Sequence, residues 1–225
     1  MTRLRRHQLA YLTAAGWRKV LGRPWTKEAA VHLTFWAERN LPLVVTRQSA
    51  ACDEGEIALG WPAPLACDRM RVALQVEGTC VAFLDEFPRA RAVVSLLPRG
   101  TRTPLQSLVH ALDALGVEPR VYGSYGWQLV TGLGYVHAGS DLDLWLSVDS
   151  QKRADDAVKL LQEAGAPKGL RIDGELMFPG GAGVAWREYA KWRTGLARGL
   201  LVKRLDGVAL EQNLPMPAWC EGIAA

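Results

Sequence analysis

Residues 141–148 read Asp-Leu-Asp-Leu-Trp-Leu-Ser-Val, and this alternation restricts the segment to one kind of structure. Successive side chains of a β-strand point to opposite faces, so Asp141, Asp143 and Trp145 share one face and the leucines share the other. We expect the leucine face to pack under helices. The other face holds two carboxylates roughly 7 Å apart, which repel each other unless a cation lies between them.

A glycine-serine pair precedes this strand. Gly123 and Ser124 follow a short predicted strand at residues 121–122 and lead into a predicted helix over residues 125–131. Glycine lets backbone amides come close to a phosphate, and a helix start offers free N–H groups and the positive end of the helix dipole. Carboxylates beside a polyphosphate select Mg²⁺. The combination predicts phosphoryl or nucleotidyl transfer, with two metal ions binding the attacking and leaving oxygens.

A third carboxylate would complete such a site, and the next predicted strand, residues 170–177, supplies two candidates. Asp173 and Glu175 are two residues apart and therefore share a face. We favour Asp173, as a ligand of the second metal ion or as the general base toward the incoming hydroxyl, and keep Glu175 as the alternative.

The chain divides at residues 97–104, a stretch rich in Pro, Gly, Arg and Thr. We therefore assign residues 1–95 to a smaller N-terminal α+β domain without an assigned role, and residues 96–225 to the domain that carries the motifs. In the first domain the pattern predicts a helix from Thr26 to Arg39 and strands over residues 43–46, 57–59 and 71–76.

In the second domain, predicted helices alternate with predicted strands. Thr103 as N-cap, Pro104 at the first helical position and Gly116 as stop predict one helix, and Ser150 and Gly165 bound another. A further helix is expected over residues 186–193 and a strand over residues 200–203. The order of elements predicts a mixed sheet with helices packed on one face.

Composition excludes several classes of protein. Hydrophobic residues make up 49% of the 225, which argues against a disordered chain. The net charge is only +4, whereas a dedicated DNA-binding protein would show a strong basic stripe. No run approaches the ~18 apolar residues of a membrane span, and no secretion signal follows the basic start. Four widely spaced cysteines indicate reduced thiols in a cytoplasmic protein (Cys52, Cys67, Cys80 and Cys220). We expect neither a nucleic-acid nor a membrane partner.

The order Gly-Ser followed by Ser-Asp-x-Asp on a strand resembles the DNA polymerase β-type nucleotidyltransferase superfamily. Sixteen residues separate Ser124 from Asp141, more than in the compact members. The fuller string GSYGWQLVTGLGYVHAGSDLDLWL, residues 123–146, resembles the phosphoribosyl-dephospho-CoA transferases that act as holo-acyl-carrier-protein synthases of malonate decarboxylase. Those proteins show a similar G-S-x-x-W-Q-x-x-T-G-L-x-Y insert before S-D-L-D-L.

The resemblance implies a polymerase-β-like nucleotidyltransferase fold for the C-terminal domain. It also implies transfer of the phosphoribosyl-dephospho-CoA group from the triphosphate precursor, 2'-(5''-triphosphoribosyl)-3'-dephospho-CoA, to a serine of the acyl carrier subunit, with release of pyrophosphate. It assigns Mg²⁺ binding to Asp141 and Asp143 and phosphate binding to Gly123 and Ser124. Lys203 lies in a segment similar to the family, and it is either a solvated surface lysine or a phosphate contact.

Two alternatives stay open at the level of the sequence. One is a nucleotidyltransferase that modifies a small molecule or another protein, and the other is a non-catalytic nucleotide-binding module. Basic residues also gather in two segments, 1–24 and 187–204. These segments are either two solvated faces or a docking surface for an acidic carrier protein and the substrate phosphates.

Overall fold

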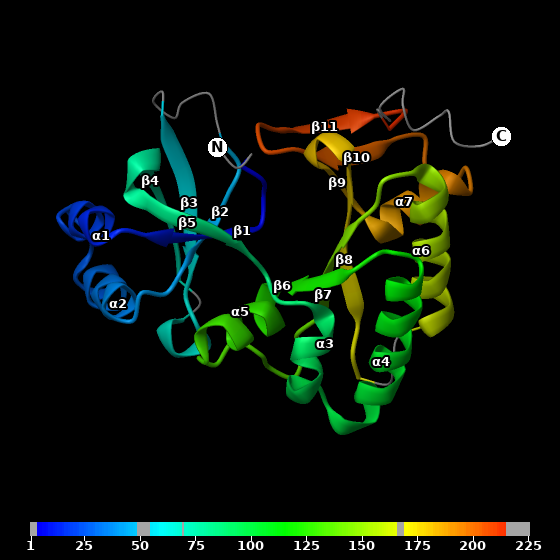
Figure 1. The fold of residues 1–225 in the computed structure, drawn as a ribbon, viewed down its shortest axis with the longest axis horizontal. Coiled ribbons are helices and arrows are strands. Elements are labelled where there is room, and N and C mark those ends of the chain that lie inside the picture. Colours follow the sequence, from blue (N-terminus) through cyan, green and yellow to red (C-terminus); the bar gives the residue numbers. More distant parts are fainter. Residues whose placement is uncertain (1–3, 49–54, 69, 166–168, 215–225) are drawn as a thin grey trace. The chain divides into compact units, whose positions relative to one another are not determined.

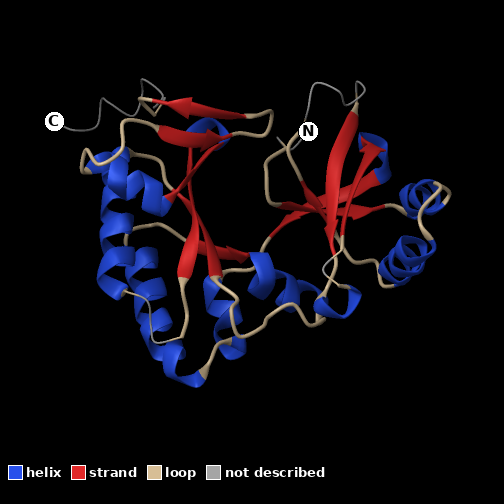
Figure 2. Ribbon diagram, turned by 180° about the vertical axis from the view of Figure 1, so that it is seen from behind, coloured by secondary structure: helices blue, strands red, loops and turns tan. Residues whose placement is uncertain are grey.

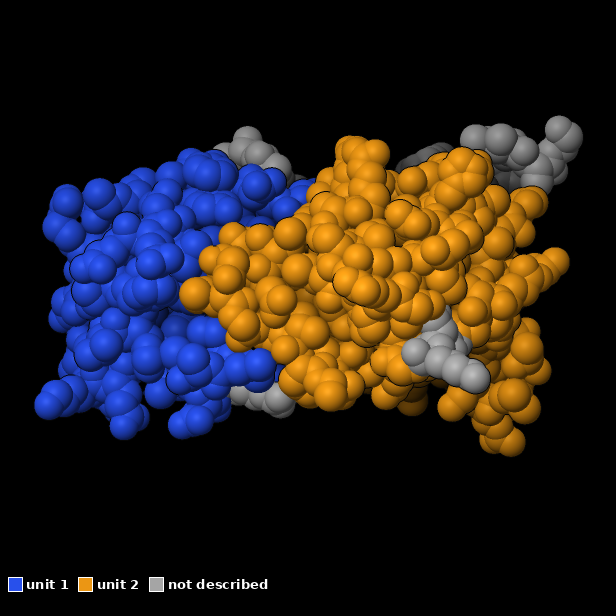
Figure 3. Space-filling view, turned by 90° about the horizontal axis from the view of Figure 1, so that it is seen from below, with its two compact units in different colours: residues 1–87, 205–207 blue, residues 88–204, 208–225 orange. Residues whose placement is uncertain are grey.

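The computed structural model describes residues 4–48, 55–68, 70–165 and 169–214 (Figure 1). The chain forms two compact units, which Figure 3 distinguishes by colour: residues 1–87 with 205–207, and residues 88–204 with 208–225. The described part contains seven α-helices and two sheets, so the fold is α+β, as predicted. The chain passes between units after Phe87, whereas the boundary expected after residue 95 lies within a short 3₁₀ helix, η3 (Val94–Leu96).

The first unit contains a five-stranded antiparallel sheet in the order β4-β3-β2-β1-β5. Its strands are β1 (Gln8–Leu12), β2 (Leu43–Val45), β3 (Glu56–Pro62), β4 (Arg71–Glu77) and β5 (Val81–Glu86). Its helices are α1 (Ala14–Leu21) and α2 (Lys27–Glu38), with short 3₁₀ turns η1 (Leu65–Cys67) and η2 (Gly78–Cys80).

Local sequence explains the predicted elements of this unit. The α2 helix begins where expected, because the Thr26 hydroxyl accepts a hydrogen bond from the Ala29 amide at 3.2 Å. Strands β2, β3 and β4 overlap the predicted strands. The core between helix and sheet includes Trp36 and Trp61, both fully buried with ring centroids 5.6 Å apart in an edge-on arrangement. Strands β1 and β5 and helix α1 were not predicted.

The second unit contains a six-stranded sheet in the order β11-β10-β9-β8-β7-β6. Its strands are β6 (Pro119–Tyr122), β7 (Leu142–Ser147), β8 (Ile172–Phe178), β9 (Ala182–Ala185), β10 (Leu200–Lys203) and β11 (Val208–Glu211). Its helices are α3 (Ala90–Val93), α4 (Arg99–Ala114), α5 (Gly123–Thr131), α6 (Gln151–Ala164) and α7 (Trp186–Arg193), with the 3₁₀ turn η4 (Pro179–Gly181). Strands β7 and β8 are parallel and the other pairs are antiparallel, so the sheet is mixed, as predicted.

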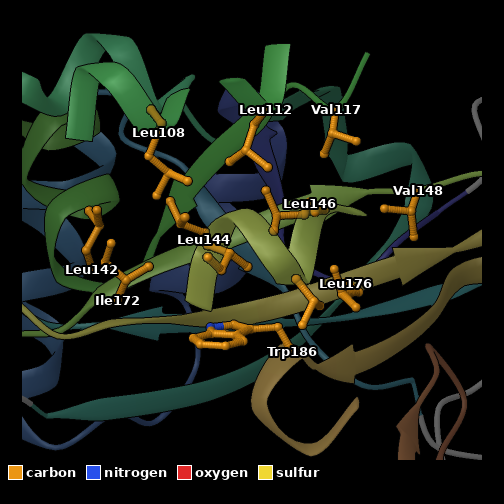
Figure 4. Packing of buried hydrophobic residues seen from close by; sticks show 14 of the residues in the cluster. Leu108, Leu112, Val117, Leu142, Leu144, Leu146, Val148, Ile172, Leu176 and Trp186 are labelled. Carbon is orange, nitrogen blue, oxygen red and sulfur yellow. The ribbon is translucent and has the colours of Figure 1, made fainter. Parts of the chain in front are cut away.

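The leucine face of β7, formed by Leu142, Leu144 and Leu146, packs as the alternation predicted. All three side chains have no exposed surface, and they lie against Leu108 and Leu112 of α4 (Figure 4). Helices α4 and α6 lie on the same side of the sheet (Figures 1 and 2). Burial of each such side chain contributes roughly 1.5–3 kcal/mol, so this face anchors the strand that carries the aspartates.

Helix α4 corrects one prediction. It begins at Arg99 rather than after Thr103, so Pro104 lies inside the helix and not at its first position. Pro98 has the extended backbone conformation of an N-cap, and the side chain of Arg102 turns back to donate to the carbonyl of Leu97 at 2.9 Å. The backbone conformation of Pro98 and the hydrogen bond from Arg102 to Leu97 therefore both agree with a helix that begins at Arg99.

Two further predictions can be compared with the structure. Of the four cysteines, Cys67 and Cys80 are free thiols, and the other two lie outside the described residues. In the described ranges, the helices are all too short or too polar to cross a membrane.

Candidate active site

The register of the sheet places Asp143 at the centre of the predicted site. Its backbone pairs with Tyr122 at the end of β6 on one side and with Asp173 of β8 on the other. Because α5 follows β6 directly, the same pairing brings Asp143 to the start of that helix. The predicted Gly-Ser pair and the predicted carboxylates therefore meet in one place.

Gly123 allows this close approach. It is the first residue of α5 and has a positive φ of 61°, a conformation that favours glycine. A Cβ atom at this position would overlap the Oδ2 atom of Asp143. A side chain at residue 123 would therefore push the carboxylate away from the helix start. Ser124 is the second residue of the same helix, so both residues predicted to bind phosphate lie in its first turn.

Asp141 and Asp173 lie beside Asp143 and share an arginine. Asp141 immediately precedes β7, one residue before the strand begins, and the backbone of Leu142 donates to the carbonyl of Arg171 at 2.8 Å. The Arg171 guanidinium lies 2.8 Å from an Asp173 oxygen and 3.5 Å from an Asp141 oxygen. Asp173 also accepts from the Gly174 amide at 2.9 Å. Sequence reasoning did not assign a role to Arg171, although its position two residues before Asp173 could have drawn attention to it.

The electrostatics of this cluster act mainly on Asp143. Burial, followed by the negative charges of Asp141 and Asp173, raises the pKa of Asp143 from 3.8 to about 7, with Arg171 opposing and Glu175 adding to the shift. At neutral pH the site thus holds a carboxyl group whose ionisation is opposed by its surroundings. A bound cation would relieve that opposition.

The acid face of the sheet is formed by Asp143 and Trp145 on β7 and by Asp173 and Glu175 on β8. Glu175 pairs with Trp145 across the strands and is only 4% exposed. Its carboxylate accepts from the Lys203 ammonium at 2.8 Å. The structure therefore joins Lys203, the predicted phosphate contact, to Glu175, the alternative third carboxylate. An ion pair of this kind fixes the position of the ammonium group on the acid face.

Trp145 adds an unsatisfied donor to the same face. Its indole N–H is buried, and no residue in the described part of the chain accepts a hydrogen bond from it. A buried donor without an acceptor carries a cost that a ligand oxygen or a water molecule would remove. This feature is compatible with an anionic ligand on the acid face.

The insert between the Gly-Ser pair and Asp141 is held by its own side chains. The Gln128 carbonyl oxygen accepts from the amides of Tyr135 and Val136 at 3.1 and 2.9 Å, which ties the loop to α5. Trp127 and Tyr135 are both buried and their rings stack at 6.1 Å. The residues of the W-Q-x-x-T-G-L-x-Y pattern therefore shape the loop that delivers Asp141, and Trp127 is a core residue.

The end of this loop is also tied to itself. The Ser140 hydroxyl accepts from the His137 amide at 3.0 Å, and the His137 ring accepts from the Gly139 amide at 3.1 Å through Nδ1. The His137 side chain is exposed to solvent. His137 thus shapes the turn before Asp141.

The donor set fits Mg²⁺ with a bound polyphosphate better than a metal ion held by protein alone. Within the described ranges, no three His, Cys, Asp or Glu side chains are arranged around one common metal position. Mg²⁺ commonly uses one or two carboxylates and completes its shell with water and phosphate oxygens. Asp141 and Asp143 supply that number, and burial, followed by the negative charges of Asp141 and Asp173, raises the pKa of Asp143.

Five described basic residues of the two terminal segments form ion pairs within their own units. In the first unit Arg5 pairs with Glu86 and Lys19 with Glu77, both at 2.7 Å. In the second unit several basic side chains likewise have acidic partners: Arg193 with Asp155, Lys203 with Glu175, and Arg204 with Glu211. These five positive charges are balanced at short range, which reduces the field available to attract an acidic partner.

Comparison with known proteins covers nearly the whole chain. Residues 5–85 match the family model for the phosphoribosyl-dephospho-CoA transferase MdcG N-terminal domain, and residues 87–213 match the model for the C-terminal domain. A phosphoribosyl-dephospho-CoA transferase of Xanthomonas campestris pv. campestris (strain 8004) is 38% identical over 91% of this chain and 92% of its own length. Its namesake from Bradyrhizobium diazoefficiens is 35% identical over 91% of this chain and 88% of its own length. None of the solved structures matches.

These matches identify a transferase enzyme. More narrowly, the chain belongs to the phosphoribosyl-dephospho-CoA transferase family. The family resemblance noted in the sequence is thereby confirmed. The boundary between the two matched domains lies next to the passage from Phe87 to Pro88, where the structure also divides.

Proposed function

We propose that this protein transfers the phosphoribosyl-dephospho-CoA group from 2'-(5''-triphosphoribosyl)-3'-dephospho-CoA to a serine of the malonate decarboxylase acyl carrier subunit in the cytoplasm. The observation that carries the proposal is membership of the transferase family over both domains. The acid face beside the start of α5 supports it, because carboxylates and free helix amides suit a metal-bound triphosphate.

We also propose that the second unit is a polymerase-β-like nucleotidyltransferase domain. Three features support this assignment. Strand β6 leads through Gly123 and Ser124 into α5, the neighbouring strand β7 carries Asp143 just after Asp141, and the sheet is mixed.

In the proposed reaction the serine oxygen attacks the α-phosphorus of the triphosphate. A phosphodiester bond forms, the bond to the β-phosphate oxygen breaks, and pyrophosphate leaves. Asp141 and Asp143 would hold Mg²⁺, which when bound stabilises the negative charge on the phosphoryl oxygens. Gly123 and Ser124 would receive the phosphates at the start of α5. Asp173 would complete the site by accepting the proton of the attacking serine, and Lys203 would contact a phosphate.

The proposal is tested by incubating the protein with the apo-carrier subunit, the triphosphate precursor and Mg²⁺. We expect the intact mass of the carrier to rise by that of the transferred group, peptide mass spectrometry to place the group on a serine, and pyrophosphate to appear in equal amount. An unmodified carrier, with ATP consumed in the presence of small hydroxyl acceptors instead, would favour a nucleotidyltransferase of different substrate.

Asp143→Asn gives the mutational test. We expect transfer to fall on the order of a thousandfold, because a bound metal ion supplies several kcal/mol of charge stabilisation. The matched control is Asp156→Asn on α6, where the carboxylate pairs with Lys152 at the surface. Carrier modification by Asp143→Asn at the wild-type rate would refute the assigned site.

A further inference from the structure

A guanidinium group lies between two of the carboxylates that the proposed reaction uses. Arg171 contacts Asp173 at 2.8 Å and Asp141 at 3.5 Å. We propose that Arg171 is an exchangeable counter-ion. It neutralises the carboxylates before substrate binds, and it moves to the triphosphate when a divalent cation takes its place. This inference rests on the proposed function and adds to it a residue that positions the substrate.

The backbone of Arg171 is hydrogen-bonded to the neighbouring strand, whereas its side chain is largely exposed. The Arg171 carbonyl accepts from the Leu142 amide at 2.8 Å, and β8 begins at the next residue, in parallel pairing with β7. The side chain of Arg171 is 57% exposed. A long side chain on a fixed backbone can change partners by rotation about its own bonds, without any change in the sheet.

The chemistry of the two ligands explains why they would exchange. A guanidinium and a divalent cation compete for the same carboxylate oxygens, and the guanidinium stays charged at all relevant pH values. Its planar fork binds phosphate as well as carboxylate. Exposed ion pairs contribute little to stability, so release of Asp141 and Asp173 costs little. Once released, Arg171 would still lie beside the carboxylates that are proposed to hold the metal-bound triphosphate.

The inference predicts that one variant, Arg171→Gln, changes the affinities for a metal ion and for a polyphosphate in opposite directions. In Arg171→Gln, Mn²⁺ alone should bind roughly three- to tenfold more tightly, because the competing cation is gone, a range expected for loss of exposed ion pairs. The Mg²⁺ complex of inorganic tripolyphosphate should bind roughly three- to tenfold more weakly, because an anion contact is lost. Electron paramagnetic resonance of free Mn²⁺ measures the first affinity and titration calorimetry measures the second.

Two control variants distinguish the effect of the Arg171 contacts from the effect of losing any positive charge near β8. Arg187→Gln also removes a positive charge near β8, since Arg187 donates to the Ile172 carbonyl at 2.8 Å and lies over the Trp186 ring. It should change either affinity less than twofold. Arg171→Lys keeps the charge and loses the fork, so its two affinities should lie between those of wild type and Arg171→Gln.

The outcomes distinguish this inference from the proposed function. Opposite shifts in Arg171→Gln, with small shifts in Arg187→Gln, support it. Shifts in the same direction, or none, overturn it, and the proposed function stands as long as Asp143→Asn loses Mn²⁺ binding and transfer. Carrier modification by a wild-type protein that binds no Mn²⁺ would overturn the metal site and this inference together.

Discussion

The two faces of strand β7 come from one alternating sequence, and their side chains lie in opposite environments. On the leucine face Leu142, Leu144 and Leu146 are fully buried against α4 and the neighbouring core. On the acid face the same strand presents Asp143, whose ionisation is opposed by burial and by Asp141 and Asp173. One face stabilises the fold, and the other carries a stability cost of the kind found at functional sites.

The largest expected effect tests the leucine face. Leu144→Ala should lower the free energy of unfolding by about 2–5 kcal/mol, because it removes buried contacts and leaves a cavity. Chemical denaturation measures the change. The control is Leu129→Ala on α5, a side chain already 37% exposed, where the loss should be smaller. Equal losses in the two variants would show that the leucine face is not the anchor described above.

The next effect has the opposite sign and tests the acid face. The folded-state pKa of Asp143, about 7, lies above its ordinary value of 3.8. The folded protein therefore binds more protons than the unfolded chain between these values, and stability falls as pH rises through this range. In metal-free protein, Asp143→Asn should unfold at the same temperature as wild type below pH 4.

Above pH 7 the same variant should be the more stable of the two, by a few kcal/mol at most, since one pKa unit corresponds to about 1.4 kcal/mol. Thermal unfolding at pH 5 and pH 8 measures the difference, and Mg²⁺ should reduce it at pH 8. A difference between the proteins that does not change with pH would mean that Asp143 ionises freely.

The smallest effect tests how closely the acid face approaches α5. Gly123 and Gly132 both have positive φ, 61° and 71°, but a Cβ atom overlaps Asp143 only at position 123 and meets nothing within 4 Å at position 132. Both alanine variants should lose about 1–2 kcal/mol from backbone strain. Gly123→Ala should lose more, and its transfer rate should fall with it. Equal unfolding energies in the two variants would contradict the close approach.

Several elements could be predicted from local sequence because local interactions decide them. Thr26 caps α2, Ser150 and Gly165 bound α6, and the alternation at residues 142–147 produces β7. The predicted start of α4 lies too late in the chain. Proline is common at the first helical position, whereas here the helix begins at Arg99 and continues through Pro104. In the first unit, β1 has no alternation to reveal it, since four of its five residues are buried.

The candidate site was predictable to a similar extent. Gly123 and Asp143 come together as the order of their elements indicated, whereas Asp173 reaches Asp143 through the register of β7 and β8. The roles of their neighbours did not follow from spacing. Glu175 is engaged by Lys203, and Arg171 lies between two carboxylates. The Lys203–Glu175 and Arg171–Asp141 contacts join residues far apart in the chain, so no local pattern encodes them.

The sequence by itself determined which side chains share a face, where the glycine precedes a helix, and which family the motifs resemble. These properties depend on the period of a strand and on residues close together in the chain. Only the tertiary structure decided that Asp173 stands beside Asp143 and that Gln128 holds the loop before Asp141. Register and loop closure depend on long-range packing, because a shift of one residue would turn every side chain of the strand to the other face.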